Sequence, residues 1–388
     1  MELFWLEHKK LWRKKIVKIC VLLCFVYCVI FGSILSFQWF CFGSSDDYTS
    51  AFGNNFDGYT VIKDSQEYAL SFGGELTDET LQKIVSDYQQ MEADGMGEEL
   101  EKTDWQIVNS WLGTLYPELR DTSNYKTMIS YVDPDKLTGF YERRQQVLDE
   151  FLEVSGQVGA EKEFLHQIER KVEKPFRYEW VEGWSTLLGS MVADLGVVMA
   201  LFLGIVLSSL FAGEWHDNTS TLVLTTRNGW GKIALAKILT GLAFTVELFA
   251  LLAVSSVISQ LFFMGTAGWN MPIQNIKLIA VAPMNMLQAE IYEYAFVLLG
   301  AIGFAGIVMF ISAAVKNNVL TLLLSLAVVY GPMMIAEYLP YEMQKALDLI
   351  PLVGSSTDIF RTNTFRIFGK LIWSPYLLIT IPVLIGIL

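Results

Sequence analysis

The fold class of this chain is decided by residues 19–42, ICVLLCFVYCVIFGSILSFQWFCF, a stretch without a single charged side chain. A helix needs about 20 consecutive apolar residues to cross the hydrocarbon core of a bilayer. This stretch is longer than that. It is also longer and more aromatic than the apolar region of a signal peptide, which ends at a small-residue cleavage site. These residues therefore predict a transmembrane helix.

The residues before this helix are strongly basic. Residues 1–18 carry six basic side chains, Lys9, Lys10, Arg13, Lys14, Lys15 and Lys18. Basic residues next to a transmembrane helix are retained on the cytoplasmic side, so we expect the N-terminus in the cytoplasm. The chain is 53% hydrophobic and its mean hydropathy is +0.38. Both values are typical of a membrane protein.

An acidic block follows the first helix. Residues 44–182 contain 29 Asp and Glu against 13 Lys and Arg, whereas the net charge of the whole chain is −13. Apolar positions recur at helical spacing in this block, with Thr77 as a candidate N-cap and a long helical pattern from Tyr141 to Lys174, and strand signals are weak. We expect a small, mainly helical extracellular domain. The acidic balance argues against a nucleic-acid partner, which needs a basic face.

Further apolar runs predict an α-helical polytopic membrane protein with six transmembrane helices. In chain order we expect a cytoplasmic N-terminal segment (1–18), the first transmembrane helix (19–42), the extracellular domain (43–182), a second transmembrane helix (183–213), a cytoplasmic segment (214–232) and helices three to six (233–388). The last four helices are expected at 233–264, 295–315, 319–336 and 371–388.

The segment FAGEWHDNTSTLVLTTRNGWGKIALAKIL, Phe211 to Leu239, differs from the apolar runs on either side of it. It mixes acidic, polar, basic and glycine residues. Two interpretations remain open. The segment simply joins two helices, with its apolar side chains in the headgroup layer. Alternatively, it docks into another protein and transmits force to the membrane helices.

This segment resembles the corresponding region of ABC-2 type transporter permeases. In that family an acidic residue ends the second helix, and a short coupling helix with a threonine follows. A turn rich in glycine and basic residues comes next, and a lysine opens the third helix. Glu214 corresponds to the acid, Thr219 to the threonine, Gly229 to the turn glycine, Lys232 to a basic turn position and Lys237 to the lysine.

Two positions depart from the family pattern. Many members have an arginine directly after the glycine, where this chain has Trp230, and a glycine before the threonine, where it has Asn218. The contacts of individual side chains therefore stay open. The order of segments adds to the resemblance, because a basic start, a large domain after the first helix and six helices extend it over nearly the whole chain.

The resemblance implies a multi-pass permease subunit of an ATP-driven exporter in the plasma membrane of a bacterial cell. A separate ABC ATPase would bind ATP and magnesium, and a second permease copy or a related permease would complete the membrane pathway. The chain itself would bind no cofactor or metal and would have no catalytic residue. The sequence agrees with that division, since it contains no G-x-x-x-x-G-K-[ST] loop.

Carboxylates inside predicted membrane helices are further candidates, because they are costly there and often functional. Glu247 lies ten residues after Lys237, which predicts a position near the middle of the bilayer. It would line the substrate path, carry a proton or pair with another helix. Asp194 is expected nearer the outer surface. Glu290 and Glu293 are expected at the outer mouth of the fourth helix.

The substrate is left open by the sequence. An amphipathic peptide, drug or lipid-like compound fits the resemblance, and sodium extrusion is an alternative. A membrane sensor or scaffold with an acidic ligand-binding domain is a second class of function. A membrane-embedded enzyme has little support, since neither an H-E-x-x-H nor a G-x-S-x-G motif is present.

Overall fold

The fold is described from a computed structural model of the chain. It describes residues 2–34, 62–63, 66–67, 69, 73–96, 105–121, 126–216, 229–347, 349–350, 352–353, 358–381 and 384. Five described helices or helical runs are long and apolar enough to cross a membrane: Lys15–Ile34, Glu182–Trp215, Gly231–Met264, Met286–Val315 and Asn318–Ile335. The chain thus has the character of a helical membrane protein.

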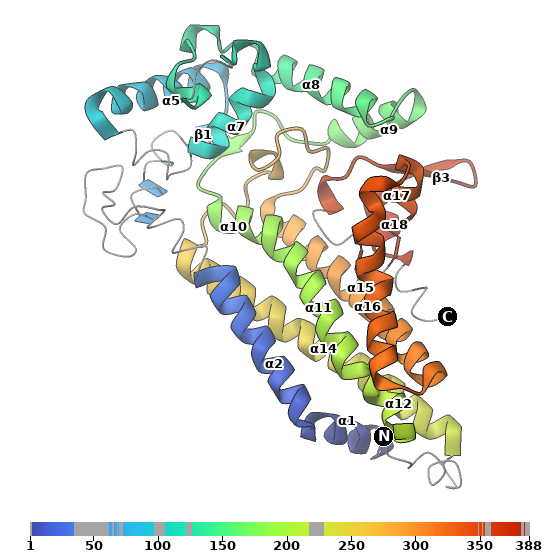
Figure 1. Cartoon of the computed structure of the whole chain (residues 1–388). Helices are drawn as coiled ribbons and strands as arrows, with labels where there is room; N and C mark the ends of the chain where they lie inside the picture. The colour runs from blue at the N-terminus through green and yellow to red at the C-terminus, as the bar shows by residue number, and fades with distance from the viewer. Residues whose placement is uncertain are drawn as a thin grey trace.

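These helices form one bundle, with a separate helical region at one end (Figure 1). The bundle contains α2 (Lys15–Tyr27) continued by the π-helix η1 (Cys28–Ile34), then α10 (Glu182–Thr186), η6 (Leu187–Met191), α11 (Val192–Leu207), α12 (Ser209–His216), α14 (Gly229–Met264), α15 (Met286–Val315) and α16 (Asn318–Ile335). Its core is apolar side chains from α2, α11, α14 and α15. Cys20, Cys24 and Cys28 are buried in it, which explains their spacing on one helix face.

The two ends of the bundle differ. We call the end that carries α1 (Glu2–Arg13), α12 and the start of α14 the basal end, and the opposite end the head end (Figure 1). The head comprises the described residues 73–181, with α5 (Asp78–Met91), η2 (Glu92–Met96), α7 (Trp105–Leu115), η3 (Pro117–Leu119), η4 (Met128–Ser130), η5 (Pro134–Lys136), α8 (Phe140–Val154), α9 (Ala160–Glu169) and the antiparallel pair β1 (Gly74–Glu75) and β2 (Arg177–Tyr178).

The head is mainly helical, as the sequence predicts. The Thr77 side chain accepts a hydrogen bond from the Thr80 amide, which confirms the N-cap of α5. The long pattern from Tyr141 to Lys174 is two helices rather than one, because the chain turns between α8 and α9 at positive-φ glycines, Gly156 and Gly159. Val154, beside that turn, is therefore exposed.

A loop of the bundle is built into the head. Residues 265–285, which join α14 to α15 and contain η7 (Ile273–Asn275), pack under α7 and α8. The Trp111 indole donates to the Asn275 carbonyl at 3.1 Å, and the Asn275 amide donates to the Arg177 carbonyl at 2.9 Å. The fully buried Arg144 donates to the Leu278 carbonyl at 2.7 Å. The head is thus attached to α14 and α15 through hydrogen-bonded backbone.

Arg144 also forms a buried ion pair inside the head. Its Nη1 lies 2.6 Å from Glu169 Oε1, and Lys174 Nζ lies 2.8 Å from the same oxygen. Burial by itself raises the pKa of Glu169, but the hydrogen bonds from Lys174 and Arg144 outweigh it and bring the pKa below its ordinary value. Burial lowers the pKa of Arg144, and Glu169 opposes that effect.

The fourth predicted helix begins earlier than expected. α15 starts at Met286, because Asn285 and Gln288 form a reciprocal capping box. Glu290 and Glu293 therefore lie in the second and third turns of α15, and they are 3% and 0% exposed.

The region expected to start the sixth helix has another structure. After α16 the chain forms η8 (Ala336–Tyr338), α17 (Tyr341–Leu347), η9 (Asp358–Phe360), an antiparallel hairpin of β3 (Thr364–Ile367) and β4 (Lys370–Trp373), and the short α18 (Ser374–Leu378). Leu371 is in a strand, so a helix from that residue is wrong. The hairpin docks on the head, with Arg366 Nη2 2.7 Å from Glu161 Oε1. Most of residues 382–388 lie outside the described part of the chain.

Candidate coupling site at the basal end

The candidate site is α12, the two-turn helix that directly precedes residues 217–228. It is separated from α11 by a break at Ser208. The next described residue after His216 is Gly229, where α14 begins, so α12 and α14 flank this segment. The contacts that hold α12 in place are therefore the local connections between this segment and the bundle.

The strongest contact comes from α14. Lys237 is 1% exposed, and its Nζ lies 2.6 Å from Glu214 Oε1. The same ammonium donates to the Leu210 carbonyl at 2.8 Å and lies 5.1 Å from the centre of the Phe211 ring. The Leu210 carbonyl, Phe211 and Glu214 all belong to α12, so a single buried lysine joins α14 to three points on this helix.

The N-terminal helix supplies two more lysines. Lys10 Nζ lies 3.8 Å from Glu214 Oε1, and its side chain is 58% exposed. Lys14, at the corner between α1 and α2, donates to the Ser209 hydroxyl at 2.9 Å. The first contact is weak because water screens it. Together they bring α1 and the start of α2 to the same short helix.

α15 holds the other side of α12. The Ser312 hydroxyl donates to the Ser208 carbonyl at 2.7 Å and accepts from the amides of Phe211 and Ala212 at 3.2 and 3.0 Å. Ser312 therefore satisfies backbone groups that the break between α11 and α12 leaves without helical partners. Beyond the end of α15, Lys316 lies 4.0 Å from the centre of the Trp215 ring.

These contacts make α12 a clamped element that three neighbouring parts of the bundle share. We call it the α12 clamp: Lys10 and Lys14 near α1, Lys237 on α14, Ser312 and Lys316 near α15, and Glu214 on α12 itself. Its chemistry is ion pairing and hydrogen bonding, not proton transfer to a substrate. Such an arrangement suits the transmission of a displacement, because moving α12 must break or carry these bonds with it.

Two of the predicted coupling residues, Glu214 and Lys237, meet in this clamp. Gly229 and Lys232 do not lie in a turn, since both are in the first turn of α14. Lys232 is exposed, and Thr219 lies outside the described residues. Sequence reasoning missed Lys10 and Lys14 as site residues. Their i, i+4 spacing on a basic helix was a usable signal, but it also fits a simple membrane-flanking segment.

Glu247 contacts the N-terminal helix instead of the bundle interior. Its carboxylate accepts from the Trp12 indole at 3.0 Å and lies 3.2 Å from His8 Nε2, and its side chain is 42% exposed. Of the expected roles, pairing with another helix matches this geometry. These contacts join α14 to α1, and the depth of Glu247 in the bilayer stays a prediction.

Asp194 lies in the first turn of α11 and is exposed. It lines a small cavity together with Tyr27 and Ser256. The structure therefore does not bring Asp194 and Glu247 together, and neither residue touches the α12 clamp.

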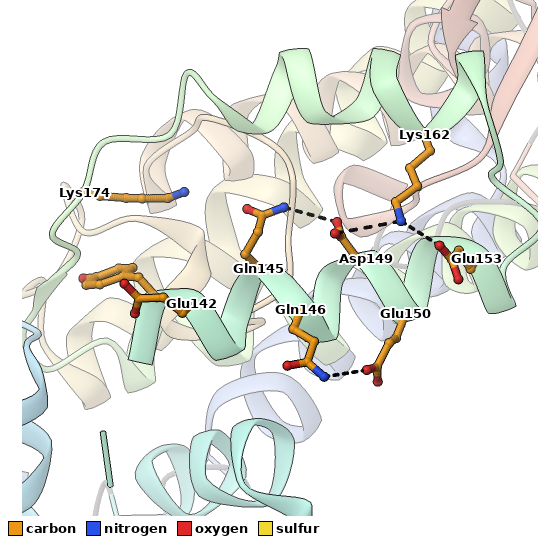
Figure 2. Close-up of a pocket in the computed structure, with 9 residues that line it drawn as sticks. Glu142, Gln145, Gln146, Asp149, Glu150, Glu153, Lys162 and Lys174 are labelled. Atoms are coloured by element: carbon orange, nitrogen blue, oxygen red, sulfur yellow. Dashed lines mark hydrogen bonds and ion pairs between the residues drawn. The ribbon is translucent and has the colours of Figure 1, made fainter. Parts of the chain in front are cut away.

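A hollow with a volume of about 650 Å³ lies on the head, between α8 and α9. It is a wide, open groove (Figure 2). Lys162 points across it from α9 to α8, 2.8 Å from Glu153 and 3.9 Å from Asp149. Gln146 donates to Glu150 at 3.0 Å. These charged groups are occupied by one another, so the groove lacks the features of a ligand site.

No protein-family model matches this chain, and no curated protein or solved structure is significantly similar to it.

Proposed function

We propose that the chain is the permease subunit of an ATP-driven ABC exporter, in which α12 and the residues after it couple the membrane helices to a separate ATPase. The observation that supports the proposal is the α12 clamp. The bundle has polar contacts concentrated on one short helix at the basal end, beside a polar connecting segment. An isolated membrane anchor has no need of such an arrangement.

The mechanical step follows from the bonds. An ATPase that moves residues 217–228 also moves α12, because the two are continuous in the chain. Lys237 and Ser312 then transmit the displacement to α14 and α15. These helices carry the 265–285 loop and the head at their other end, so a shift at the basal end reaches the head through packed helices.

In this proposal the basal end faces the cytoplasm and the acidic head faces outward, as the basic N-terminal segment predicts. The exported compound in this proposal is amphipathic, a peptide, drug or lipid-like molecule, as the resemblance to the permease family implies. A second permease copy, or a related chain, would complete the pathway. ATP and magnesium are bound by the partner.

Site-directed crosslinking in native membranes tests the proposal. Thr219→Cys is combined with a cysteine-reactive crosslinker, and the product is identified by mass spectrometry. The expected product is a covalent adduct with a protein that contains a phosphate-binding loop and hydrolyses ATP. Val154→Cys on the exposed turn of the head is the matched control and should give no such adduct.

A second measurement separates coupling from binding. The double variant Glu214→Gln/Lys237→Met removes the buried ion pair without leaving a lone charge. We expect the ATPase still to co-purify and to hydrolyse ATP, while ATP-dependent export falls. If no ATPase is recovered in any mild detergent, the sensor or scaffold function takes the place of the exporter. ATP-dependent sodium movement in vesicles would identify the sodium-extruding alternative.

A further inference from the structure

A line of polar side chains runs between α14 and α15 in the half of the bundle nearer the head. Ser256 on α14 lies 3.1 Å from the Tyr294 hydroxyl on α15. At 1.5 Å per residue, Ser256 is roughly 14 Å along α14 from Glu247, on the side of the head. Both residues of this pair belong to runs that are long and apolar enough to cross a membrane, Gly231–Met264 and Met286–Val315.

One helical turn nearer the head, the equivalent positions on α14 and α15 carry two further polar side chains. Gln260 follows Ser256 by four residues on α14, and Glu290 precedes Tyr294 by four residues on α15. Consecutive helices run in opposite directions, so both positions lie one turn beyond the Ser256–Tyr294 contact and on the same faces. The register thus places Gln260 and Glu290 at corresponding turns of the two helices, without a hydrogen bond between them in the structure.

Both side chains are buried. Gln260 is 0% exposed and Glu290 is 3% exposed. By hydrogen-bond geometry, neither the amide atoms of Gln260 nor the carboxyl oxygens of Glu290 have a partner among the described residues, and Tyr294, one turn along α15, is the side chain that interacts with the Glu290 carboxyl group. Leu261 and Ala289, the neighbours of the two residues in the chain, belong to an apolar cluster.

A small cavity reaches the other end of this polar line. It has a volume of about 20 Å³, enough for a water molecule. Its lining contains Asp194, Tyr27, Cys28 and Ser256. It is bordered by two π-helical segments, since Cys28 belongs to η1 and Met191 to η6. Such segments are rare and often occur at functional sites.

The charged form of Glu290 is very unfavourable at this position. An ionised carboxylate in an apolar interior costs several kcal/mol unless a cation or several donors compensate it. The described part of the chain has no Lys or Arg in an ion pair with Glu290. The neutral acid, by contrast, can donate one hydrogen bond to the Gln260 carbonyl oxygen and accept one from the Gln260 amide.

We propose that Glu290 and Gln260 form a buried proton-binding site, loaded from Asp194 through the cavity, Ser256 and Tyr294. Loading transfers one proton from hydronium to the Glu290 carboxylate and leaves one water molecule. The hydroxyls of Ser256 and Tyr294 each accept a proton and donate one, so neither changes its charge. This inference does not depend on the identity of the ATPase partner or the exported compound.

The titratable groups along the proposed path come from several elements. They are Tyr294 on α15, Tyr27 on α2, Cys28 in η1 and Asp194 on α11, and Glu293 follows Glu290 by three residues on α15. Glu293 is engaged separately, because its carboxylate accepts from the Ile359 amide at 2.6 Å. Asp194 is the exposed carboxylate that lines the cavity, which makes it the entry point.

Infrared difference spectroscopy of the purified full-length protein in lipid nanodiscs, without any ATPase, tests the proposal. The carbonyl stretch of a protonated, buried carboxylic acid is recorded as the pH is raised. We expect one such band to persist at neutral pH, to shift in heavy water and to be lost in Glu290→Gln. Glu247→Gln is the matched control, since Glu247 is a half-exposed carboxylate on the neighbouring helix, and it should leave the band unchanged.

Two further variants keep the test decisive if Glu290→Gln does not fold. Gln260→Leu should shift the band to the frequency of a weakly hydrogen-bonded acid. Tyr294→Phe should keep the band but slow its exchange with heavy water several-fold. The absence of a protonated-acid band at neutral pH in the wild type would overturn the proposal. So would a band that disappears when choline is replaced by sodium or potassium, since that result assigns the site to a metal cation.

Discussion

For the ion pair between Glu214 and Lys237, we predict that removing one partner lowers the free energy of unfolding more than removing the other. The Lys237 side chain is 2% exposed, and Glu214, 2.6 Å away, is the carboxylate with which it forms an ion pair among the described residues. Glu214 is 16% exposed and has a second cation, Lys10, at 3.8 Å. Removing the carboxylate should therefore cost more free energy of unfolding than removing the ammonium.

The distance between the charges of Glu214 and Lys237 gives the expected size of these energy losses. With an effective dielectric constant of about 20, two unit charges at 2.6 Å attract each other by roughly 6 kcal/mol before desolvation. The exposed Lys10 contributes about 1 kcal/mol at most, because water screens it. Breaking a buried pair on one side costs about 3–5 kcal/mol, since the other charge is left buried. We expect that loss for Glu214→Gln, and about 1–3 kcal/mol for Lys237→Met, which removes a hydrogen bond to a charged group.

The double variant tests whether the losses in free energy of unfolding of the two single variants simply add. Glu214→Gln/Lys237→Met leaves no buried unpaired charge, so it should be more stable than Glu214→Gln alone. The free energy of unfolding is measured in mixed micelles with a rising fraction of denaturing detergent. Lys10→Met serves as the exposed control and should change stability by less than about 1 kcal/mol. If Glu214→Gln costs no more than Lys237→Met, or if the two losses add, the buried-charge account is wrong.

Three other predictions concern the head and its attachment. Glu169→Gln should lower the free energy of unfolding by about 3–5 kcal/mol, because it leaves Arg144 buried without a carboxylate, whereas Glu163→Gln, which breaks an exposed pair with Arg170, should change it by less than about 1 kcal/mol. The pKa of Glu169 is lowered in the folded state. Its contribution to the free energy of unfolding is therefore present above the unfolded pKa and is lost as the pH falls through the folded pKa. Pulse proteolysis across acidic pH should show this loss for the wild type and not for Glu169→Gln. Gly268→Ala should be much more destabilising than Gly156→Ala in a thermal melt, since both have positive φ but an added Cβ collides with the Trp180 carbonyl at Gly268 and meets open space at Gly156. Thr77→Ala should cost about 1 kcal/mol by removing the N-cap of α5, and chemical denaturation of the head measures it.

Several features follow from short stretches of sequence. The uncharged run after residue 18 and the later apolar runs give the membrane character, because hydropathy is a property of contiguous residues. Thr77 marks the start of α5 because an N-cap acts on amides three residues away. The spacing of Cys20, Cys24 and Cys28 places them on one face, and the structure turns that face into the core.

Helix boundaries were less accessible to sequence reasoning. The hydropathy run suggested that the fourth helix begins near residue 295, but the polar first turns of α15 are covered by the 265–285 loop and the head, so they need not be apolar themselves. Leu371 to Trp373 read as membrane helix because strands and helices in apolar runs look alike. These residues form strand β4 because they pair with strand β3.

The sequence by itself determined that this is a helical membrane chain with a basic start and an acidic, helical insertion. Only the tertiary structure decided that Lys10 and Lys237 meet at Glu214, that Ser312 closes the break before α12, and that Ser256 meets Tyr294 between α14 and α15. The reason is physical. Hydropathy and capping act over a few residues, whereas these pairings join positions up to about two hundred residues apart and depend on how the helices pack.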